Sequence, residues 1–193
     1  MTNLSDFSAD ELDQILQAPG AVLRGAAVVD GEHGGIRFLR EATAGGLAIR
    51  KAREHENDFV RSVALALRDK GEADAAAEAE AAANPAARVG VAAAAAATQE
   101  AAELGRPRDP EAEAAHAVEL SGAVLTLLRA RADEEDVAAY REWLLRIAAR
   151  VAGAVRTREG GFFSRRVKVS APEQAFLDRL AAAVGSDPVH PQG

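Results

Sequence analysis

The sequence predicts an all-α protein, a compact bundle of seven to nine helices with an alanine-rich middle. Apolar residues recur at steps of three and four, which is the period of a helix with one buried face. Helix-start signals recur along the chain, and no stretch alternates apolar and polar residues as a strand would. The 193 residues are enough for one ordinary domain, so we expect a single helical domain over 1–193, with residues 186–193 as a disordered tail.

The first two helices are expected on either side of a proline. Ser8 and Glu11 have the spacing of a capping box, in which each side chain accepts a hydrogen bond from the backbone of the other residue. Pro19 disfavours a helical residue before it, so the first helix should end there and a second should begin. The second helix is expected to end at residues 30–31, where an acidic residue precedes a glycine.

The next two helices lead up to the alanine-rich middle. One helix is expected over 36–52, with a weak point at the two adjacent glycines 45–46, each of which costs roughly 1 kcal/mol against alanine. Another should begin near Asn57 and stop at Gly71. The residues at helical spacing that form its buried stripe are Phe59, Val60, Val63, Ala64 and Leu67.

Residues 72–104 are mostly alanine and glutamate, and they leave two alternatives open. Alanine is the best helix former, so the segment should be helical, but alanine buries little area and packs weakly. The segment could form closely packed helices with small faces, which we favour, or a semi-exposed helical arm or insertion. Residues 105–110 are the clearest linker in the chain.

Three helices are expected after the linker. The first spans 110–130, and Asp133 then caps a second helix whose apolar residues alternate steps of three and four. Ser170 and Glu173 repeat the capping-box spacing at the start of the last helix. The seam of the second helix, widened by the neighbouring Trp143, consists of Val137, Tyr140, Leu144, Ile147, Val151 and Ala154.

Composition and charge exclude several classes of protein. With 27% charged residues and no apolar run long enough to span a bilayer, we expect no membrane insertion. The absence of cysteine excludes disulfide scaffolds, thiolate metal sites and thiol catalysis. The net charge of −7 argues against general nucleic-acid binding. The polar, acidic N-terminal segment has no features of a signal peptide, so we expect a cytoplasmic location.

A Glu-x-x-His pattern is one candidate for a divalent metal site. Glu113 and His116 would share one face of a helix, which is half of the ligand set in ferritin-like di-iron bundles. The chain has no second copy, so a homodimer would have to complete the site, with Glu100, Glu103 or Glu119 as further ligands. The alternative is an exposed polar face at the start of a helix.

The acidic turn after the second helix is another candidate metal site. Asp30 and Glu32 flank a glycine and could hold a hard cation such as calcium, although the spacing is not that of an EF-hand. The alternative is an acidic helix end that holds no ligand. We expect no other cofactor.

The order of features around this turn resembles the start of bacterial TerB-like proteins, which are associated with tellurite resistance. The resemblance rests on Ala18-Pro19, an apolar helix, Val29-Asp30-Gly31-Glu32, and a following helix with an internal acid at Glu41. The chain departs from that pattern in having Val29 where alanine is usual. The resemblance implies a small cytoplasmic helical domain with an accessory or stress-related role and no established enzymatic chemistry.

A basic segment near the C-terminus is a candidate contact surface in an otherwise acidic protein. Its two adjacent aromatic residues and surrounding cations could hold a phosphate, an acidic partner helix or a single-stranded nucleic acid. Alternatively, the cations are solvated and the aromatic rings fill a gap between helices. The residues of this segment are Arg156, Arg158, Phe162, Phe163, Arg165, Arg166 and Lys168.

Taken together, these features favour a non-catalytic helical protein that acts through partner binding or self-assembly as a homo-oligomer, with a stress (tellurite or metal) role as the resemblance implies. The sequence has no nucleophile elbow, phosphate-binding loop or zinc-protease motif. Two alternatives stay open: a metal-binding ferritin-like protein that uses Glu113 and His116, and a helical enzyme without a recognisable motif.

Overall fold

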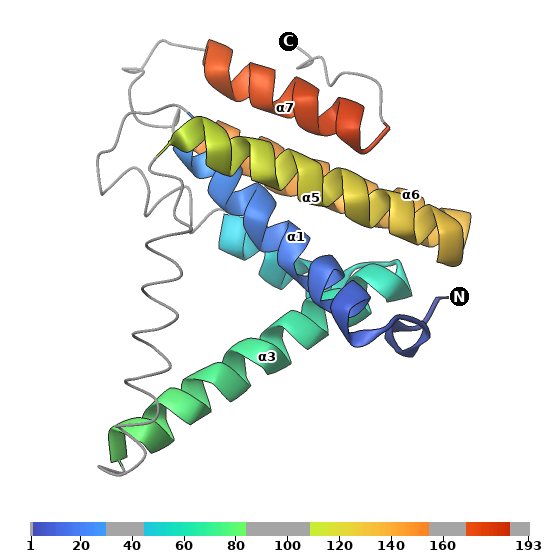
Figure 1. Cartoon of the computed structure of the whole chain (residues 1–193), viewed down its shortest axis with the longest axis vertical. Coiled ribbons are helices and arrows are strands. Elements are labelled where there is room, and N and C mark those ends of the chain that lie inside the picture. The colour runs from blue at the N-terminus through green and yellow to red at the C-terminus, as the bar shows by residue number, and fades with distance from the viewer. Residues whose placement is uncertain (1, 30–44, 84–108, 155–168, 186–193) are drawn as a thin grey trace.

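In the computed structural model, which describes residues 2–29, 45–83, 109–154 and 169–185, every regular element in these ranges is helical (Figure 1). The all-α prediction is therefore confirmed. Six α-helical segments are described rather than seven to nine: α1 (Ala9–Val28), residues 45–51, α3 (Asp58–Ala83), α5 (Pro110–Arg131), α6 (Glu134–Ala154) and α7 (Ala171–Ala183). Two single 3₁₀ turns accompany them, η1 (Leu4–Asp6) and η2 (Ala52–Glu54).

The core lies where α1, α5, α6 and α7 pack together. α1 lies against both α5 and α6, and α7 contacts the same pair (Figure 1). The seam predicted for α6 is confirmed, since Val137, Leu144, Ile147 and Val151 are all buried. Among the described helices, none combines the length and the apolar character that crossing a bilayer requires.

The predicted helix break at Pro19 is wrong, because α1 runs through the proline without interruption. A proline inside a helix has no N–H to give to the carbonyl four residues earlier, here that of Ile15. The Tyr140 hydroxyl of α6 donates to this Ile15 oxygen at 2.6 Å instead. The buried carbonyl therefore keeps a partner, and Pro19 is tolerated in the core.

The capping boxes at the starts of α1 and α7 are confirmed. Ser8 N–H donates to Glu11 Oε2 at 2.8 Å, and Glu11 N–H donates to Ser8 Oγ at 3.4 Å. The same reciprocal pair joins Ser170 and Glu173, at 2.8 and 3.3 Å. Each box satisfies backbone N–H groups that a helix start otherwise leaves unpaired.

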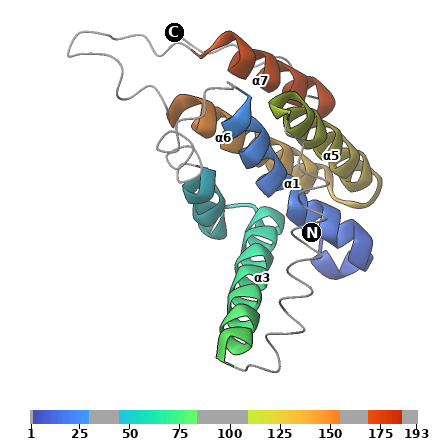
Figure 2. The same cartoon turned by 60° about the vertical axis from the view of Figure 1, so that its left-hand side comes forward.

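The predicted stop at Gly71 is also wrong, because α3 continues to Ala83. The N-terminal part of α3 packs on the core through buried residues such as Phe59 and Val63. The remainder, which we call the α3 arm (residues 68–83), projects away from the bundle, and its residues 68–77, 79 and 80 are exposed (Figure 2). Alanine favours the helical conformation, but its small side chain offers little apolar area to bury. The exposure of residues 72–77, 79 and 80 agrees with the arm alternative and not with the close packing that we favoured; residues 84–104 lie outside the described residues.

Aromatic rings form a continuous chain through the core towards one surface of the bundle. Phe7 and Phe59 lie with ring centroids 6.1 Å apart, and Phe59 lies 6.0 Å from Tyr140. Tyr140 meets Trp143 edge to face at 5.7 Å and an interplanar angle of 77°. This contact fixes the orientation of the Trp143 indole.

Candidate binding pocket

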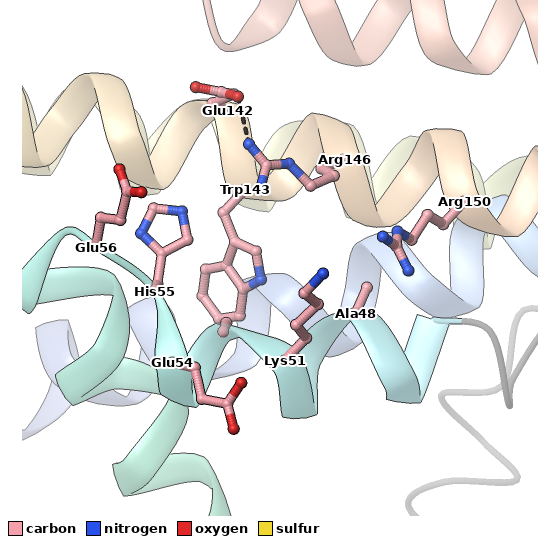
Figure 3. A pocket seen from close by; sticks show the side chains of 10 residues that line it. Ala48, Lys51, Glu54, His55, Glu56, Glu142, Trp143, Arg146 and Arg150 are labelled. Carbon is pink, nitrogen blue, oxygen red and sulfur yellow. Dashed lines mark hydrogen bonds and ion pairs between the residues drawn. The ribbon is translucent and has the colours of Figure 1, made fainter.

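A pocket of about 460 Å³ lies between residues 48–56 and α6 (Figure 3). Its apolar floor consists of Ala48 and Ala52 on one side and Trp143 on the other. Residues 48, 51, 52 and 55 face the pocket together because steps of three and four place side chains on one face of a helical segment. We call this site the Trp143 pocket.

The indole N–H of Trp143 is a polar group of the pocket that is buried. Trp143 is 2% exposed, and its Nε1–H has no hydrogen-bond partner among the described residues. Leaving a buried donor unpaired costs about 1–3 kcal/mol. In Figure 3 the indole nitrogen lies on the side of the ring where Lys51 and Arg150 also lie.

Three cations line the pocket, and they differ in their partners. Arg146 forms an ion pair with Glu142 one helical turn earlier. Lys51 and Arg150 are exposed, and no carboxylate in the described part of the chain forms an ion pair with either of them. Within the described part of the chain, these two side chains are thus pocket-lining cations without a counter-charge.

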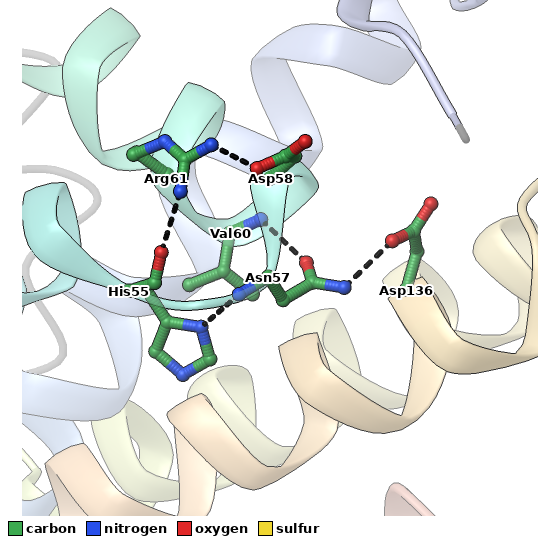
Figure 4. Close-up of polar contacts among 6 residues, drawn as sticks. All are labelled: His55, Asn57, Asp58, Val60, Arg61 and Asp136. Carbon is green, nitrogen blue, oxygen red and sulfur yellow. Dashed lines mark hydrogen bonds and ion pairs between the residues drawn. The ribbon is translucent and has the colours of Figure 1, made fainter.

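His55 contributes a further donor, and its tautomer follows from its hydrogen bonds. The Asn57 backbone N–H donates to His55 Nδ1 at 3.1 Å, so the neutral ring carries its proton on Nε2 (Figure 4). Arg61 Nη1 donates to the His55 carbonyl at 2.8 Å, which holds the backbone of this wall in place.

A polar network anchors this wall to α6 through Asp136. Asn57 Nδ2 donates to Asp136 Oδ1 at 2.7 Å, and Asn57 Oδ1 accepts from the Val60 backbone N–H at 3.0 Å (Figure 4). The Thr2 backbone N–H donates to Asp136 Oδ2 at 3.0 Å. Burial acts to raise the pKa of Asp136, but the hydrogen bonds from Thr2 and Asn57 outweigh it and lower the pKa below its ordinary value. The Asp136 carboxylate is thus ionised and links the pocket wall to α6 through its hydrogen bond from Asn57.

The pocket also contains carboxylates, so its rim is of mixed sign. Glu54, Glu56 and Glu142 line it together with the three cations. The carboxylates and cations are equal in number, so the rim has no formal net charge. A binding site of this kind favours a ligand group whose charge matches one part of the rim, rather than any anion or cation.

The Glu-x-x-His pair predicted as a metal site lies elsewhere, on α5. Glu113 accepts from Arg24 Nε of α1 at 3.1 Å, and His116 is exposed. No group of three or more potential metal ligands occurs within the described ranges. The carboxylate is therefore engaged in joining α1 to α5.

The other predicted sites lie outside the described residues. These are the acidic turn with Asp30 and Glu32, and the basic segment with Arg156, Arg158, Phe162, Phe163, Arg165, Arg166 and Lys168. Both stay predictions. The same holds for Glu100 and Glu103, two of the three further metal ligands considered above, and for the tail at residues 186–193; the third, Glu119, is exposed on α5.

Little in the amino-acid pattern predicted the Trp143 pocket. Trp143 was expected only to widen the apolar face of its helix, and the other lining residues had no assigned role. One usable signal was that Trp143 is the only tryptophan in the chain and stands among cations at steps of three and seven, Arg146 and Arg150. The pocket itself depends on how residues 48–56 dock on α6, which local sequence patterns do not specify.

Comparison with known proteins identifies no family. No protein-family model, no curated protein and no solved structure matches the chain. The resemblance to TerB-like proteins therefore stays a prediction, and any function must be argued from the pocket itself.

Proposed function

We propose that this is a non-catalytic helical protein that acts by binding a partner polypeptide in the Trp143 pocket. The observation that carries the proposal is a buried tryptophan that lines a pocket with charged walls and whose N–H has no partner among the residues that the structure describes. Tryptophan and arginine are the residue types most enriched among those that dominate binding energy at protein interfaces. Here one tryptophan lies beside two arginines of the same helix.

The arrangement of the pocket supports a peptide-like ligand. The apolar floor of Ala48, Ala52 and Trp143 suits an aliphatic side-chain stem, while the charged rim suits the polar end of such a side chain. Rim charges also steer the approach of a partner and reject partners with the wrong charge pattern. A second copy of this chain and a small molecule are the other possible occupants, and the test separates them.

The test compares a pocket variant with a control variant whose substitution lies outside the pocket. Lys51→Glu combined with Arg150→Glu reverses the two pocket cations that have no ion pair among the described residues, whereas Arg50→Glu reverses an exposed cation next to Lys51 that does not line the pocket. Proteins captured from the native cell extract by the wild type would be identified, purified and titrated directly. We expect affinity to fall about tenfold or more for the pocket variant, which corresponds to about 1.4 kcal/mol, and to change little for the control.

Three results would contradict the proposal. The first is equal affinity of the captured protein for all three forms, and the second is the absence of any protein that binds the purified wild type. The third is a dimer in light scattering that the pocket variant alone dissociates, because the occupant would then be a second copy of the chain rather than a partner.

A further inference from the structure

Trp143, Lys51 and Arg150 all line the pocket, and the polar groups of all three side chains are hydrogen-bond donors. The indole N–H, the ammonium of lysine and the guanidinium of arginine can donate hydrogen bonds but cannot accept them. Trp143 Nε1–H has no partner in the described chain, and the side chains of Lys51 and Arg150 lie on the same side of the ring (Figure 3). The carboxylate nearest in sequence on α6, Glu142, pairs with Arg146 instead.

We infer that this part of the pocket is a carboxylate-binding subsite, in which one oxygen accepts from Trp143 Nε1–H and the anionic group pairs with Lys51 and Arg150. The inference rests on the proposed function and deepens it, because it names the partner group that the pocket recognises: an Asp or Glu side chain.

The chemistry of the donors favours a carboxylate over other acceptors. A neutral amide could accept from the indole but would leave the ammonium and guanidinium without a counter-charge. A phosphate dianion would neutralise the two cations but would lie beside Glu54, Glu56 and Glu142, which repel it more strongly than a monoanion. A carboxylate supplies two oxygens in a plane and one negative charge, which matches one N–H and a pair of flexible cations.

The Trp143 ring is held more firmly than the side chains of Lys51 and Arg150. Trp143 is 2% exposed and is held by its edge contact with Tyr140, whose centroid lies 5.7 Å away. Lys51 and Arg150 are exposed and have long side chains with several rotatable bonds. A ligand would therefore enter as these side chains rotate onto it, and the indole would stay in place as a fixed donor.

The single tryptophan makes the subsite directly measurable. Emission from Trp143 would be followed during titration with acetate, with the capped amino acid N-acetyl-glutamate amide and with its glutamine counterpart, all at constant ionic strength set with chloride. We expect saturable changes with acetate and with the glutamate compound, and none with the glutamine compound. A parallel titration with inorganic phosphate tests the other class of anion, and we expect phosphate to bind more weakly than acetate.

Charge-neutralising variants show where the anion binds. Lys51→Gln with Arg150→Gln should weaken acetate binding by about tenfold, as expected for loss of charge-assisted partners, while Arg50→Gln should leave it unchanged. Emission that responds to acetate no more than to chloride, or equal acetate affinity in both variants, would overturn the inference. Tighter binding of phosphate than of acetate would overturn the carboxylate assignment.

The outcome also separates this inference from the proposed function. Saturable acetate binding without any polypeptide partner would leave the subsite standing and refute the function. A partner that binds in the pocket while acetate has no effect would support the function and refute the subsite.

Discussion

Removing the Tyr140 hydroxyl tests how α1 tolerates a proline in its interior. Pro19 cannot donate to the Ile15 carbonyl, and the Tyr140 hydroxyl donates to it at 2.6 Å in the buried core. Burial also raises the pKa of Tyr140, so the hydroxyl remains a protonated donor throughout the ordinary pH range. Tyr140→Phe keeps the ring but leaves the Ile15 oxygen unpaired.

The expected cost follows from the desolvation of that oxygen. An unsatisfied buried acceptor costs about 1–3 kcal/mol, and the substitution leaves the packing of the ring unchanged. With a urea m-value of about 1–3 kcal/mol/M, the unfolding midpoint should fall by roughly 1 M. Far-UV circular dichroism is the suitable probe, because Tyr140 contacts Trp143 and the substitution would alter tryptophan emission directly.

A second substitution isolates the hydrogen bond. Pro19→Ala restores a backbone N–H four residues after Ile15, so the carbonyl no longer depends on Tyr140. In that background, Tyr140→Phe should cost less than about 0.5 kcal/mol, which gives a coupling energy of about 1–2 kcal/mol between the two positions. The same penalty in both backgrounds would refute this explanation of the uninterrupted helix.

Other substitutions test the packing and the electrostatics by the same urea assay. Gly71→Ala in the exposed α3 arm should stabilise by about 0.5–1 kcal/mol, and a loss of stability there would contradict the helix through that position. Gly25→Ala would place its Cβ 2.9 Å from that of Ala117 and should destabilise by about 1–3 kcal/mol; no effect would mean that α1 and α5 lie further apart. Leu144→Ala should cost roughly 2–5 kcal/mol, and an unchanged midpoint would mean that the α6 seam is exposed. Because the pKa of Asp136 is lowered in the folded state, its ionised form stabilises the protein above pH 3.8, and this stability is lost as the pH falls through the lower folded pKa. Asp136→Asn should therefore reduce the acid-side dependence of the unfolding free energy on pH. An unchanged dependence would contradict the hydrogen-bond network around Asp136.

Structural features set by residues close together in the sequence were predictable, and features that depend on contacts between distant residues were not. The boxes at Ser8 and Ser170 were correct because each closes within three residues of its own helix start. The break at Pro19 was wrong because the compensating donor, Tyr140, lies 125 residues from Ile15 in the sequence. The stop at Gly71 was wrong because the alanine-rich residues after it favour helix strongly enough to carry α3 onwards.

The candidate site was harder to predict for the same reason. Trp143 was placed correctly in the apolar face of α6, but the lack of a partner for its N–H within the described ranges becomes apparent only when its surroundings are known. The predicted pair Glu113 and His116 does lie on one face of α5, yet Glu113 is bound to Arg24 from α1. Spacing along one helix shows which residues share a face. The residues of the neighbouring helix, here Arg24 of α1, determine which interactions that face makes.

The most direct test of the account is the NMR signal of the Trp143 indole N–H, which is the only indole resonance the protein can give. We expect this resonance to shift downfield and to exchange more slowly with water when a glutamate-containing partner segment binds, because the N–H then gains a charged acceptor. The Lys51→Gln, Arg150→Gln variant should show a much smaller shift at the same concentration. An indole resonance that is unchanged in a bound complex would contradict the claim that the Trp143 pocket recognises its partner through this donor.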